Sequence, residues 1–182
     1  MAELKIPVTE KDHIQGELGA PVILVEYGDY ECPHCGRAYP VVQRVQKHFG
    51  KRIGFVFRNF PLNEIHPNAE AAAETAEFAG ANGRFWEMHD GIFENQGSLS
   101  LPMLLELAKE LGLSESGLGG ALTSREFAAR VKSDFIGGAR SGVNGTPTFF
   151  INGERFDGPA EFEGLVAGID GALAGAPGKP GR

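Results

Sequence analysis

Cys32 and Cys35 are the only cysteines in this chain of 182 residues, and two residues separate them. They follow an apolar run at residues 21–27 and precede a segment of helical periodicity at residues 33–49. With Pro33 at the first helical position, Cys32 is expected near the N-cap, where unpaired N–H groups and the helix dipole favour a thiolate. The thiolate is the nucleophile in disulfide exchange. We therefore predict a redox-active pair, with Cys32 as the exposed attacking thiol and Cys35 as the resolving thiol.

His34 lies between the cysteines and offers a donor or a positive charge, which should lower the pKa of Cys32 further. Three other interpretations are weaker. A structural disulfide that closes so short a loop would constrain the unfolded chain little. A metal site made of the cysteines and histidines would have to bridge two chains to reach four ligands. A redox-inert peptide-binding or chaperone module would not need the intact pair. We expect a redox-active Cys32–Cys35 disulfide and neither a metal nor another cofactor.

The composition is that of an ordinary globular domain, with 42% apolar and 23% charged residues and a formal net charge of −7. No basic block is visible, which argues against nucleic acid or an anionic membrane as a partner. No run approaches the roughly 20 apolar residues of a membrane span. We expect a single domain, a monomer, that acts on protein thiols and disulfides and works with an unidentified redox partner.

The first seven residues contain no apolar segment of the kind found in signal peptides. Two explanations are compatible with this beginning. The protein is cytoplasmic, or it is a periplasmic or otherwise extracytoplasmic protein whose signal peptide has been removed. The expectation favoured here is a cytoplasmic protein.

Two groups of strands are expected, separated by a helical region. A strand, a helix and a second strand form a βαβ unit with a right-handed crossover at residues 21–27, 33–49 and 53–60. After residue 142 a strand, a hairpin turn, a short strand and a last helix follow at residues 146–151, Asn152-Gly153, 154–156 and 160–173. The Gly- and Pro-rich tail at 175–182 is expected to be disordered.

The region between about residues 66 and 125 is predicted to be an all-helical insertion, in a domain made of residues 14–65 and 126–173. Its predicted helices run over residues 66–79, 83–95, 100–111 and 114–122. Thr123 and Glu126 have the spacing of a capping box, which should open a further helix to about residue 139. His13 has no visible partner and is expected at the surface.

Several motifs together resemble the bacterial DsbA-like thiol–disulfide oxidoreductases over residues 14–173. They are the ten residues from Glu26 to Cys35, Phe60-Pro-Leu62, His66-Pro67, Phe85-Trp86 and the nine residues from Gly145 to Gly153. The resemblance implies an α/β, thioredoxin-like fold with a helical insertion, Cys32 as attacking thiol and Cys35 as resolving thiol. It also implies a cis Pro147 that packs against the disulfide and a buried Glu26 beside the resolving thiol.

Glu26 interrupts an apolar strand, which is costly unless its carboxylate is satisfied or functional. Burial would raise its pKa and let it shuttle the Cys35 proton, whereas the alternative is a solvated carboxylate at a fraying strand end. Pro147 cannot donate to a strand ladder. A cis bond there would turn the Thr146 backbone toward the cysteines, where it could pair with an extended substrate. The alternative is an ordinary edge or loop proline.

Thr146 departs from the resemblance, because Val commonly precedes the cis proline in DsbA-type oxidases and Thr does so in the disulfide isomerases. The direction of the reaction therefore stays open. A dimerisation domain of the isomerase kind is absent from the sequence, so isomerase activity is not favoured. The Pro-His dipeptide at a helix N-terminus favours the reduced pair and predicts a relatively oxidising couple, above about −200 mV.

Overall fold

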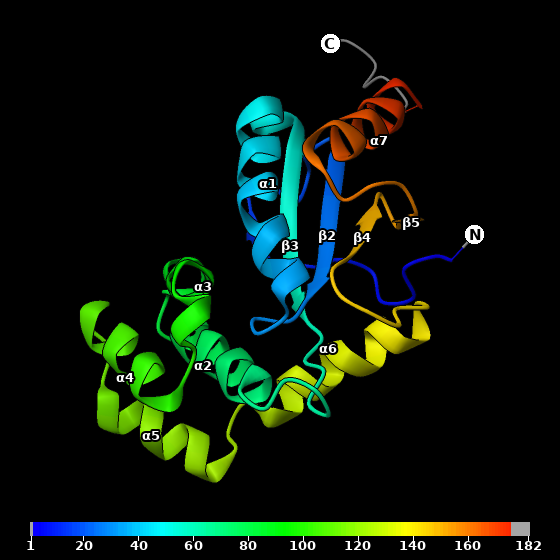
Figure 1. The fold of residues 1–182 in the computed structure, drawn as a ribbon. Helices are drawn as coiled ribbons and strands as arrows, with labels where there is room; N and C mark the ends of the chain where they lie inside the picture. Colours follow the sequence, from blue (N-terminus) through cyan, green and yellow to red (C-terminus); the bar gives the residue numbers. More distant parts are fainter. Residues whose placement is uncertain (1, 176–182) are drawn as a thin grey trace.

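The structure is a computed structural model that describes residues 2–175 of the chain. A five-stranded sheet with the order β1-β3-β2-β4-β5 forms its centre (Figure 1). The strands are β1 (His13–Gln15), β2 (Val22–Gly28), β3 (Ile53–Asn59), β4 (Thr148–Ile151) and β5 (Glu154–Phe156). β2 and β3 are parallel and the other neighbouring pairs are antiparallel, so the predicted βαβ unit and the returning hairpin are both present.

Both faces of the central strand β2 are covered, and its alternate residues pack on opposite sides. Leu24 belongs to the larger core cluster, which includes residues of α1 (Pro33–Phe49) and α7 (Phe162–Gly175). Val25 belongs to a second cluster on the other face, which α6 (Ala128–Arg140) helps to cover. A strand covered on both faces explains the near-continuous apolar sequence of residues 21–27.

α1 begins where the turn after β2 ends. Cys32 is its N-cap, with an extended backbone (φ −70°, ψ 122°), and Pro33 lies in the first turn, as predicted. The helix ends at Gly50, whose φ of 55° is easily adopted only by a residue without a side chain. One buried stripe of the helix, which starts with Cys35, packs on the sheet. The fold therefore places both cysteines at the end of the central strand.

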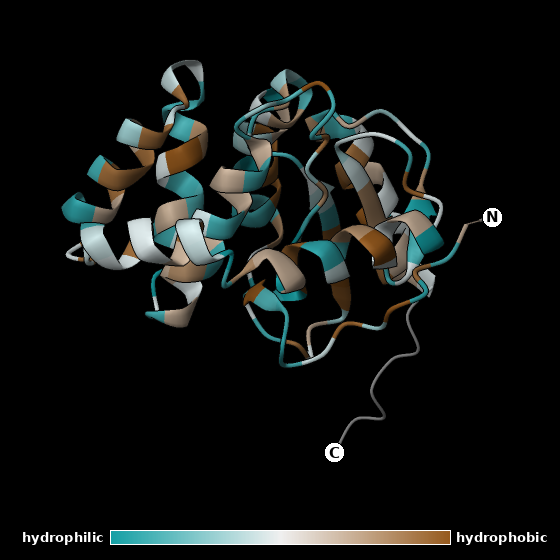
Figure 2. Cartoon of the chain, turned by 90° about the horizontal axis from the view of Figure 1, so that it is seen from below, coloured by the Kyte–Doolittle hydropathy of each residue, from teal (hydrophilic) through white to brown (hydrophobic). Residues whose placement is uncertain are grey.

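Four helices connect β3 to α6: α2 (Ala69–Ala81), α3 (Phe85–Glu94), α4 (Leu101–Glu110) and α5 (Glu115–Ser124). They form a lobe to one side of the sheet (Figures 1 and 2). Met88, Leu104 and Leu118 are fully buried within it. The arrangement is the predicted α/β fold with an all-helical insertion, and we propose that the insertion has the predicted limits near residues 66 and 125.

The predicted capping box at Thr123 and Glu126 is wrong. Thr123 lies inside α5, where its hydroxyl donates to a backbone carbonyl one turn earlier (2.9 Å) and caps nothing. Arg125 then ends α5 in the left-handed conformation (φ 58°), and α6 starts after this turn. The guanidinium of Arg125 pairs with the carboxylates of Glu70 and Glu74 in α2. These tertiary ion pairs offset the cost of a left-handed arginine, and a local sequence pattern does not reveal them.

The expectation that His13 lies at the surface without a partner is also wrong. Its Nε2 atom is 2.8 Å from Glu77 Oε2 in α2, and its ring stacks on Phe85 of α3. The edge strand β1 is thus covered by the insertion. The predicted disordered tail at residues 175–182 lies outside the described residues, apart from Gly175, which is the last residue of α7.

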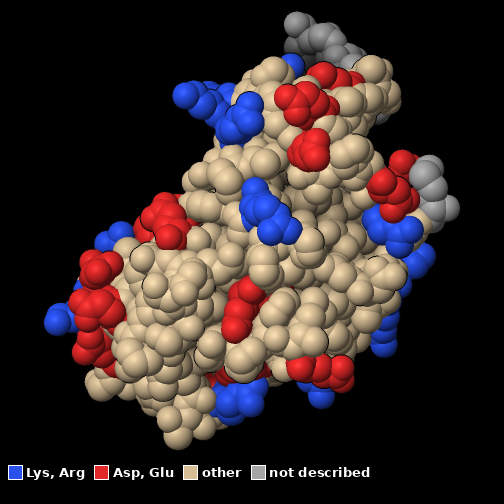
Figure 3. Space-filling model, viewed as in Figure 1, with Lys and Arg blue, Asp and Glu red and all other residues tan. Residues whose placement is uncertain are grey.

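Charged side chains of both signs are interspersed on the face shown in Figure 3. Basic residues there stand singly or in small groups near acidic ones, as expected for a sequence without a basic block. No helix within residues 2–175 has the length and apolar character needed to cross a membrane.

Candidate active site

Cys32 and Cys35 meet at the N-terminus of α1. They lie 4.0 Å apart as free thiols. Cys32 Sγ is 3.6 Å from the backbone oxygen of Thr146, and the backbone N–H of Asp29 donates to Cys35 Sγ (3.5 Å). Cys32 is only 3% exposed and Cys35 is fully buried, so the expectation of an exposed Cys32 is wrong. The surroundings of the two sulfurs distinguish them more than exposure does.

The two thiols have very different acidities. A hydrogen bond from the Cys35 thiol lowers the pKa of Cys32 to about 5, and the backbone N–H groups of His34 and Cys35 add to this against the effect of burial. Burial raises the pKa of Cys35 well above its usual range, and its bond to Cys32 and the Glu26 carboxyl add to the rise. At neutral pH Cys32 is therefore a thiolate and Cys35 a thiol. Stepwise disulfide exchange requires this asymmetry.

Glu26 in β2 is 3% exposed and lies on the side of the sheet that faces α1. Burial raises its pKa to about 8, and the negative charge of Cys32 contributes to the shift. Among the described residues, no hydrogen-bond partner reaches its buried Oε1 atom. The alternative of a solvated carboxylate at a fraying strand end is therefore wrong. Glu26 is protonated at neutral pH, close enough to the cysteines to influence the pKa of Cys35.

A cavity of about 370 Å³ extends from Glu26 between α1 and α3. Besides Glu26, its polar lining residues are Gln15, Tyr39, Gln43, Gln46, His89 and Asp90. The Tyr39 hydroxyl donates to Asp90 Oδ1 (2.9 Å) and accepts a hydrogen bond from the exposed Gln43 (2.8 Å). A polar cavity of this size has room for several water molecules.

The peptide bond between Thr146 and Pro147 is cis, as the resemblance implies. These residues precede β4, which starts at Thr148 instead of the predicted residue 146. The bond brings the Thr146 carbonyl to Cys32. The buried hydroxyl of Thr146 has no hydrogen-bond partner within residues 2–175. Pro147 is therefore not an ordinary edge or loop proline, and that alternative interpretation is wrong.

Pro33 and His34 form the first turn of α1 and are exposed. The His34 ring contacts Arg37, with 2.5 Å between Nδ1 and the guanidinium Nη2. The group of His34 that lowers the pKa of Cys32 is its backbone N–H. An effect of the His34 ring on Cys32 stays a prediction.

Asp29 organises the cysteine turn, and sequence reasoning missed it. Its backbone oxygen accepts a hydrogen bond from Cys32 N (3.1 Å), and its N–H is the group that points to Cys35. Its buried carboxylate accepts hydrogen bonds from Leu62 N (2.8 Å) and the His66 ring (2.7 Å). The available signal was an aspartate between a buried strand and the cysteines, because Asp often orders turns through its side chain.

Gln96, between α3 and α4, is a second missed residue. Its Nε2 atom donates to the backbone oxygens of Tyr30 and Cys32 (both 2.9 Å). A Cβ atom at Gly36 would lie 2.1 Å from Gln96 Oε1, so a side chain there would displace the Gln96 amide. These contacts join positions 64 and 66 residues apart, so no local pattern indicates them.

His66 and His89 are engaged with other side chains. His66 bonds Asp29, and His89 Nδ1 is 2.9 Å from the hydroxyl of Tyr30. Burial lowers the pKa of His89 to about 3, so its ring is neutral. In the part of the chain that the structure describes, no three His, Cys, Asp or Glu side chains are grouped in a way that could hold a metal ion.

Comparison with known proteins places the chain in a wider context. The sequence model of the thioredoxin family matches residues 8–171. The Na⁺/H⁺ antiporter NhaA 1 of Salinispora arenicola (strain CNS-205) is 44% identical over 174 residues, and NhaA 3 of Salinispora tropica is 41% identical over 175. These alignments cover 95% and 96% of this chain but 26% and 27% of the antiporters. The chain spans about a quarter of the length of the curated relatives it matches.

Solved structures confirm the predicted fold. BdbD from Bacillus subtilis, in its oxidised form, is 25% identical with a TM-score of 0.85, over 95% of this chain and 98% of that one. A thioredoxin-like oxidoreductase from Silicibacter pomeroyi DSS-3 is 25% identical with a TM-score of 0.80, over 91% and 94%. The α-DsbA1 protein of Wolbachia pipientis, 19% identical with a TM-score of 0.81 over 95% and 96%, shares the fold.

The cytoplasmic location expected from the sequence is wrong. DsbA-like homologues are periplasmic or extracytoplasmic proteins. The expectation relied on the absence of an apolar segment in the first residues. The residues at which a chain happens to begin carry no information on the compartment in which its folded domain works.

Proposed function

The chain belongs to the thioredoxin family as a DsbA-like thiol–disulfide oxidoreductase, and we propose that it exchanges disulfides with protein substrates through Cys32 and Cys35. DsbA-like proteins act on protein substrates and normally need no cofactor. The observation that carries the proposal is the contrast between Cys32, with a pKa of about 5, and Cys35, with a pKa raised well above its usual range. This contrast suits exchange, in which one thiol attacks or leaves as a thiolate and the other resolves the mixed disulfide.

In the oxidising direction, a substrate thiolate attacks Cys32 Sγ of the disulfide. The Cys32–Cys35 bond breaks, a mixed disulfide forms, and Cys35 leaves and takes the proton of Glu26. The second substrate thiolate then attacks its own partner sulfur in the mixed disulfide, and Cys32 leaves as a thiolate. The substrate dithiol is oxidised and the cysteine pair is reduced. Because the pKa of Cys32 is about 5, this last departure needs no proton at neutral pH.

Glu26 is the proposed proton donor and acceptor for Cys35. It is a buried carboxyl with a pKa of about 8, so it changes protonation state at small cost near neutral pH. The polar cavity between α1 and α3 would let it exchange the proton with solvent before the next turnover. Pro33 and His34 would contribute by holding the N-terminal turn of α1 beneath the Cys32 sulfur.

The backbone of Thr146 and Pro147 is proposed to align the substrate. The bond before Pro147 is cis, and the Thr146 carbonyl lies beside Cys32, where an extended chain can add to it through main-chain hydrogen bonds. Main-chain pairing would hold a substrate cysteine near Cys32 without selecting the side chains around it. This suits an enzyme that meets many different polypeptides.

We infer that the couple is oxidising, above about −200 mV, because stabilising the Cys32 thiolate stabilises the reduced pair. Equilibration with glutathione redox buffers, read by trapping of free thiols, tests both the activity and its direction. A value near −270 mV, typical of thioredoxin, would contradict the oxidising assignment and indicate a general reductase. Failure to exchange with glutathione at all would overturn the proposed function.

A second candidate is a redox domain that serves a Na⁺/H⁺ antiporter. The observation that favours it is the similarity to an antiporter from Salinispora arenicola. The alignment is 44% identical and covers 95% of this chain and about a quarter of the antiporter. Antiport by that complete relative can be measured under oxidising and reducing conditions, with and without the segment that this chain matches. Equal rates in all four cases would remove this candidate.

A further inference from the structure

The outer face of α1 concentrates positive charge in a chain that is acidic as a whole. Residues 32–63 include six of the 17 basic residues and none of the 24 acidic ones, although the formal net charge of the chain is −7. Four of these cations follow one another along α1 and the short 3₁₀ turn Gly50–Arg52 that continues it. They are Arg37, Arg44, Lys47 and Lys51, all exposed, and we call them the α1 stripe. Successive members are seven, three and four positions apart, so the sequence shows no basic block.

The α1 stripe faces away from the core. Positions three, four and seven apart lie on one face of a helix. The buried residues of α1 form the opposite face and pack on the sheet; they are Cys35, Ala38, Val42, Val45 and Phe49. In Figure 3, blue groups lie over α1 and red groups lie over the elements beside it. The stripe is therefore open to solvent and has charges of one sign.

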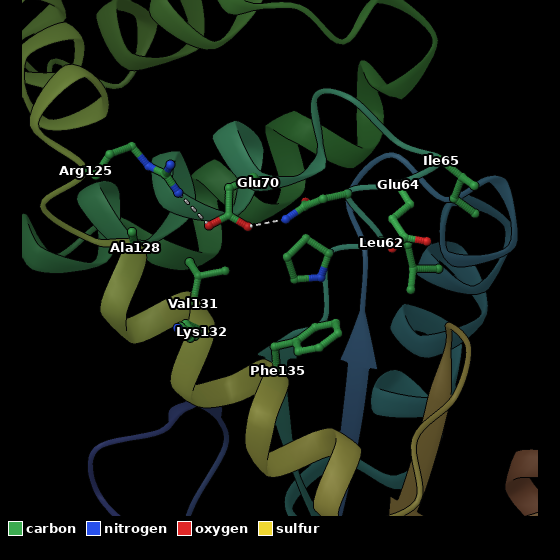
Figure 4. A pocket seen from close by; sticks show the side chains of 11 residues that line it. Leu62, Glu64, Ile65, Glu70, Arg125, Ala128, Val131, Lys132 and Phe135 are labelled. Carbon is green, nitrogen blue, oxygen red and sulfur yellow. Dashed lines mark hydrogen bonds and ion pairs between the residues drawn. The ribbon is translucent and has the colours of Figure 1, made fainter.

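The cations of the α1 stripe have no carboxylate partner within residues 2–175. Most arginines outside the stripe do have one, as Arg125 has with Glu70 and Glu74 of α2 (Figure 4). The guanidinium of Arg44 instead stacks over the ring of Phe162 in α7, 4.2 Å from the ring centroid, and stays exposed. A guanidinium that is held in place without a carboxylate is ready to bind one from another molecule.

The α1 stripe starts at the cysteine pair. Arg37 lies two positions after Cys35, and its guanidinium contacts the ring of His34. Lys51 marks the other end, so at about 1.5 Å per helical residue the length of helix from Cys32 to Lys51 is about 28 Å. About eight or nine residues of an extended polypeptide cover that length. A polypeptide whose cysteine is bound at Cys32 can therefore place the residues next to that cysteine along the whole stripe.

The charge of the stripe indicates the partner that fits it. The rest of the chain is acidic and repels a negatively charged partner, so attraction confined to α1 would both bring such a partner in and orient it. A nucleic acid fits less well, because domains that bind it are usually basic overall. Building on the proposed function, we propose that the α1 stripe binds an acidic segment of the polypeptide whose cysteine reacts with Cys32.

Disulfide transfer from the oxidised protein to two matched peptides tests the proposal. Both peptides contain a pair of reduced cysteines; one has glutamates within about eight residues of them, and the other has glutamines at the same positions. The quantity compared between variants is the ratio of the two second-order rate constants, because this comparison removes the effect of the glutamates on the peptide's own thiols. In Lys47→Gln, Lys51→Gln the ratio of acidic to neutral peptide should fall by about fivefold at low salt, and about 1 M salt should abolish the difference from the wild type. An equal ratio in both proteins at low salt would overturn the proposal.

Matched control variants remove or keep the same charges. Lys109→Gln, Lys132→Gln neutralises two exposed lysines, one on α4 in the insertion and one on α6, which covers the opposite face of the sheet from α1. This control should keep the wild-type ratio. Lys47→Arg, Lys51→Arg retains the charge of the stripe and should also keep it. A ratio that falls as much in Lys109→Gln, Lys132→Gln as in the stripe variant would show that net charge, and not the stripe, selects the peptide.

A binding measurement separates this proposal from the proposed function. The double variant Cys32→Ser, Cys35→Ser cannot exchange disulfides, and its affinity for a fluorescent, glutamate-rich peptide without cysteine can be followed by anisotropy at low salt. Adding Lys47→Gln and Lys51→Gln should weaken binding by about fivefold. Unaltered binding, or tighter binding of a short duplex DNA than of the peptide, would overturn the assignment to an acidic polypeptide even where exchange is normal. A stripe that binds the peptide in a protein that fails to exchange would leave this inference standing and overturn the proposed function.

Discussion

The surroundings of Cys32 and Cys35 differ sharply, although both sulfurs belong to the first turn of one helix. The hydrogen bond from the Cys35 thiol, helped by the Thr146 side chain and by the backbone N–H groups of Cys35 and His34, lowers the pKa of Cys32 to about 5. The side of Cys35 is the apolar face of the sheet, where burial and the Glu26 carboxyl raise the pKa of Cys35. The motif at the helix N-terminus supplies most of the groups that lower the pKa of Cys32, and the tertiary structure raises that of Cys35.

Each side also contains one buried oxygen without a hydrogen-bond partner among residues 2–175, Glu26 Oε1 near Cys35 and Thr146 Oγ1 near Cys32. A buried polar atom without a hydrogen-bond partner lowers the stability of the folded state by about 1–3 kcal/mol. Their presence on both sides of the pair indicates that the site gives up stability for chemistry. The following predictions test this contrast, from the largest expected effect to the smallest.

Serine substitutions separate the two thiols most strongly. We expect Cys32→Ser to abolish exchange, because the low-pKa sulfur is lost, with a rate more than about 1000-fold lower. Cys35→Ser should instead accumulate mixed disulfides through Cys32, which non-reducing electrophoresis and mass spectrometry detect. Faster alkylation of Cys35 than of Cys32 in the reduced protein at pH 6 would contradict the assignment.

Glu26→Gln removes the proton acceptor on the Cys35 side. The step in which Cys35 gains or loses its proton should slow by about 100-fold near neutral pH, while the attack on Cys32 should keep its rate. Single-turnover kinetics over a range of pH measure both steps. A pH–rate profile identical to that of the wild type would exclude Glu26 from proton transfer.

The stability of the reduced protein should reveal the two pKa shifts with opposite signs. Cys32 is a thiolate when folded and a thiol when unfolded between pH 5 and 9, so it makes stability rise with pH over that range. Glu26 is protonated when folded and ionised when unfolded between pH 4.5 and 8, so it makes stability fall. The two slopes nearly cancel between pH 5 and 8.

In Glu26→Gln the Glu26 contribution is lost and that of Cys32 remains. Relative to the wild type, the free energy of unfolding of the reduced variant should rise by about 1.4 kcal/mol for each pH unit between pH 5 and 8. Urea titrations at several pH values measure this difference. Parallel pH dependences for the two proteins would mean that Glu26 is ionised in the folded state.

Thr146→Val gives the smallest expected effect. The substitution keeps the shape of the side chain and removes a buried hydroxyl without a partner, so the free energy of unfolding should increase by about 1 kcal/mol. The pKa of Cys32 should also rise, because the Thr146 side chain is one of the groups that lower it, and the pH dependence of the Cys32 thiolate absorbance measures this change. A destabilised variant would show that the hydroxyl makes a bond in solution.

Much of this arrangement follows from short-range patterns. The N-cap position of Cys32 depends on Pro33 and the strand before it, and α1 spans the predicted residues. The burial of Glu26 follows from its place in an apolar strand. Neighbours within a few positions encode these features, which is why a single sequence reveals them.

Other features depend on residues far apart in the chain. Gln96 reaches the cysteine turn from the insertion, and Arg125 ends α5 only because Glu70 and Glu74 are near in space. The loop that follows β3 is held by Asp29, more than thirty positions away. A local pattern gave the wrong answer for the capping box at residue 123, because the ion pairs that determine the turn are tertiary.

The sequence by itself determined the type of chemistry, the helix that presents it and the strand that carries the buried acid. Each of these depends on backbone propensity and on the period of apolar residues, which neighbouring residues specify. Only the tertiary structure decided that Cys32 is buried and that burial and the Glu26 carboxyl raise the pKa of Cys35. Burial and electrostatic fields are sums over groups that folding brings together, so they exist only once the chain has folded.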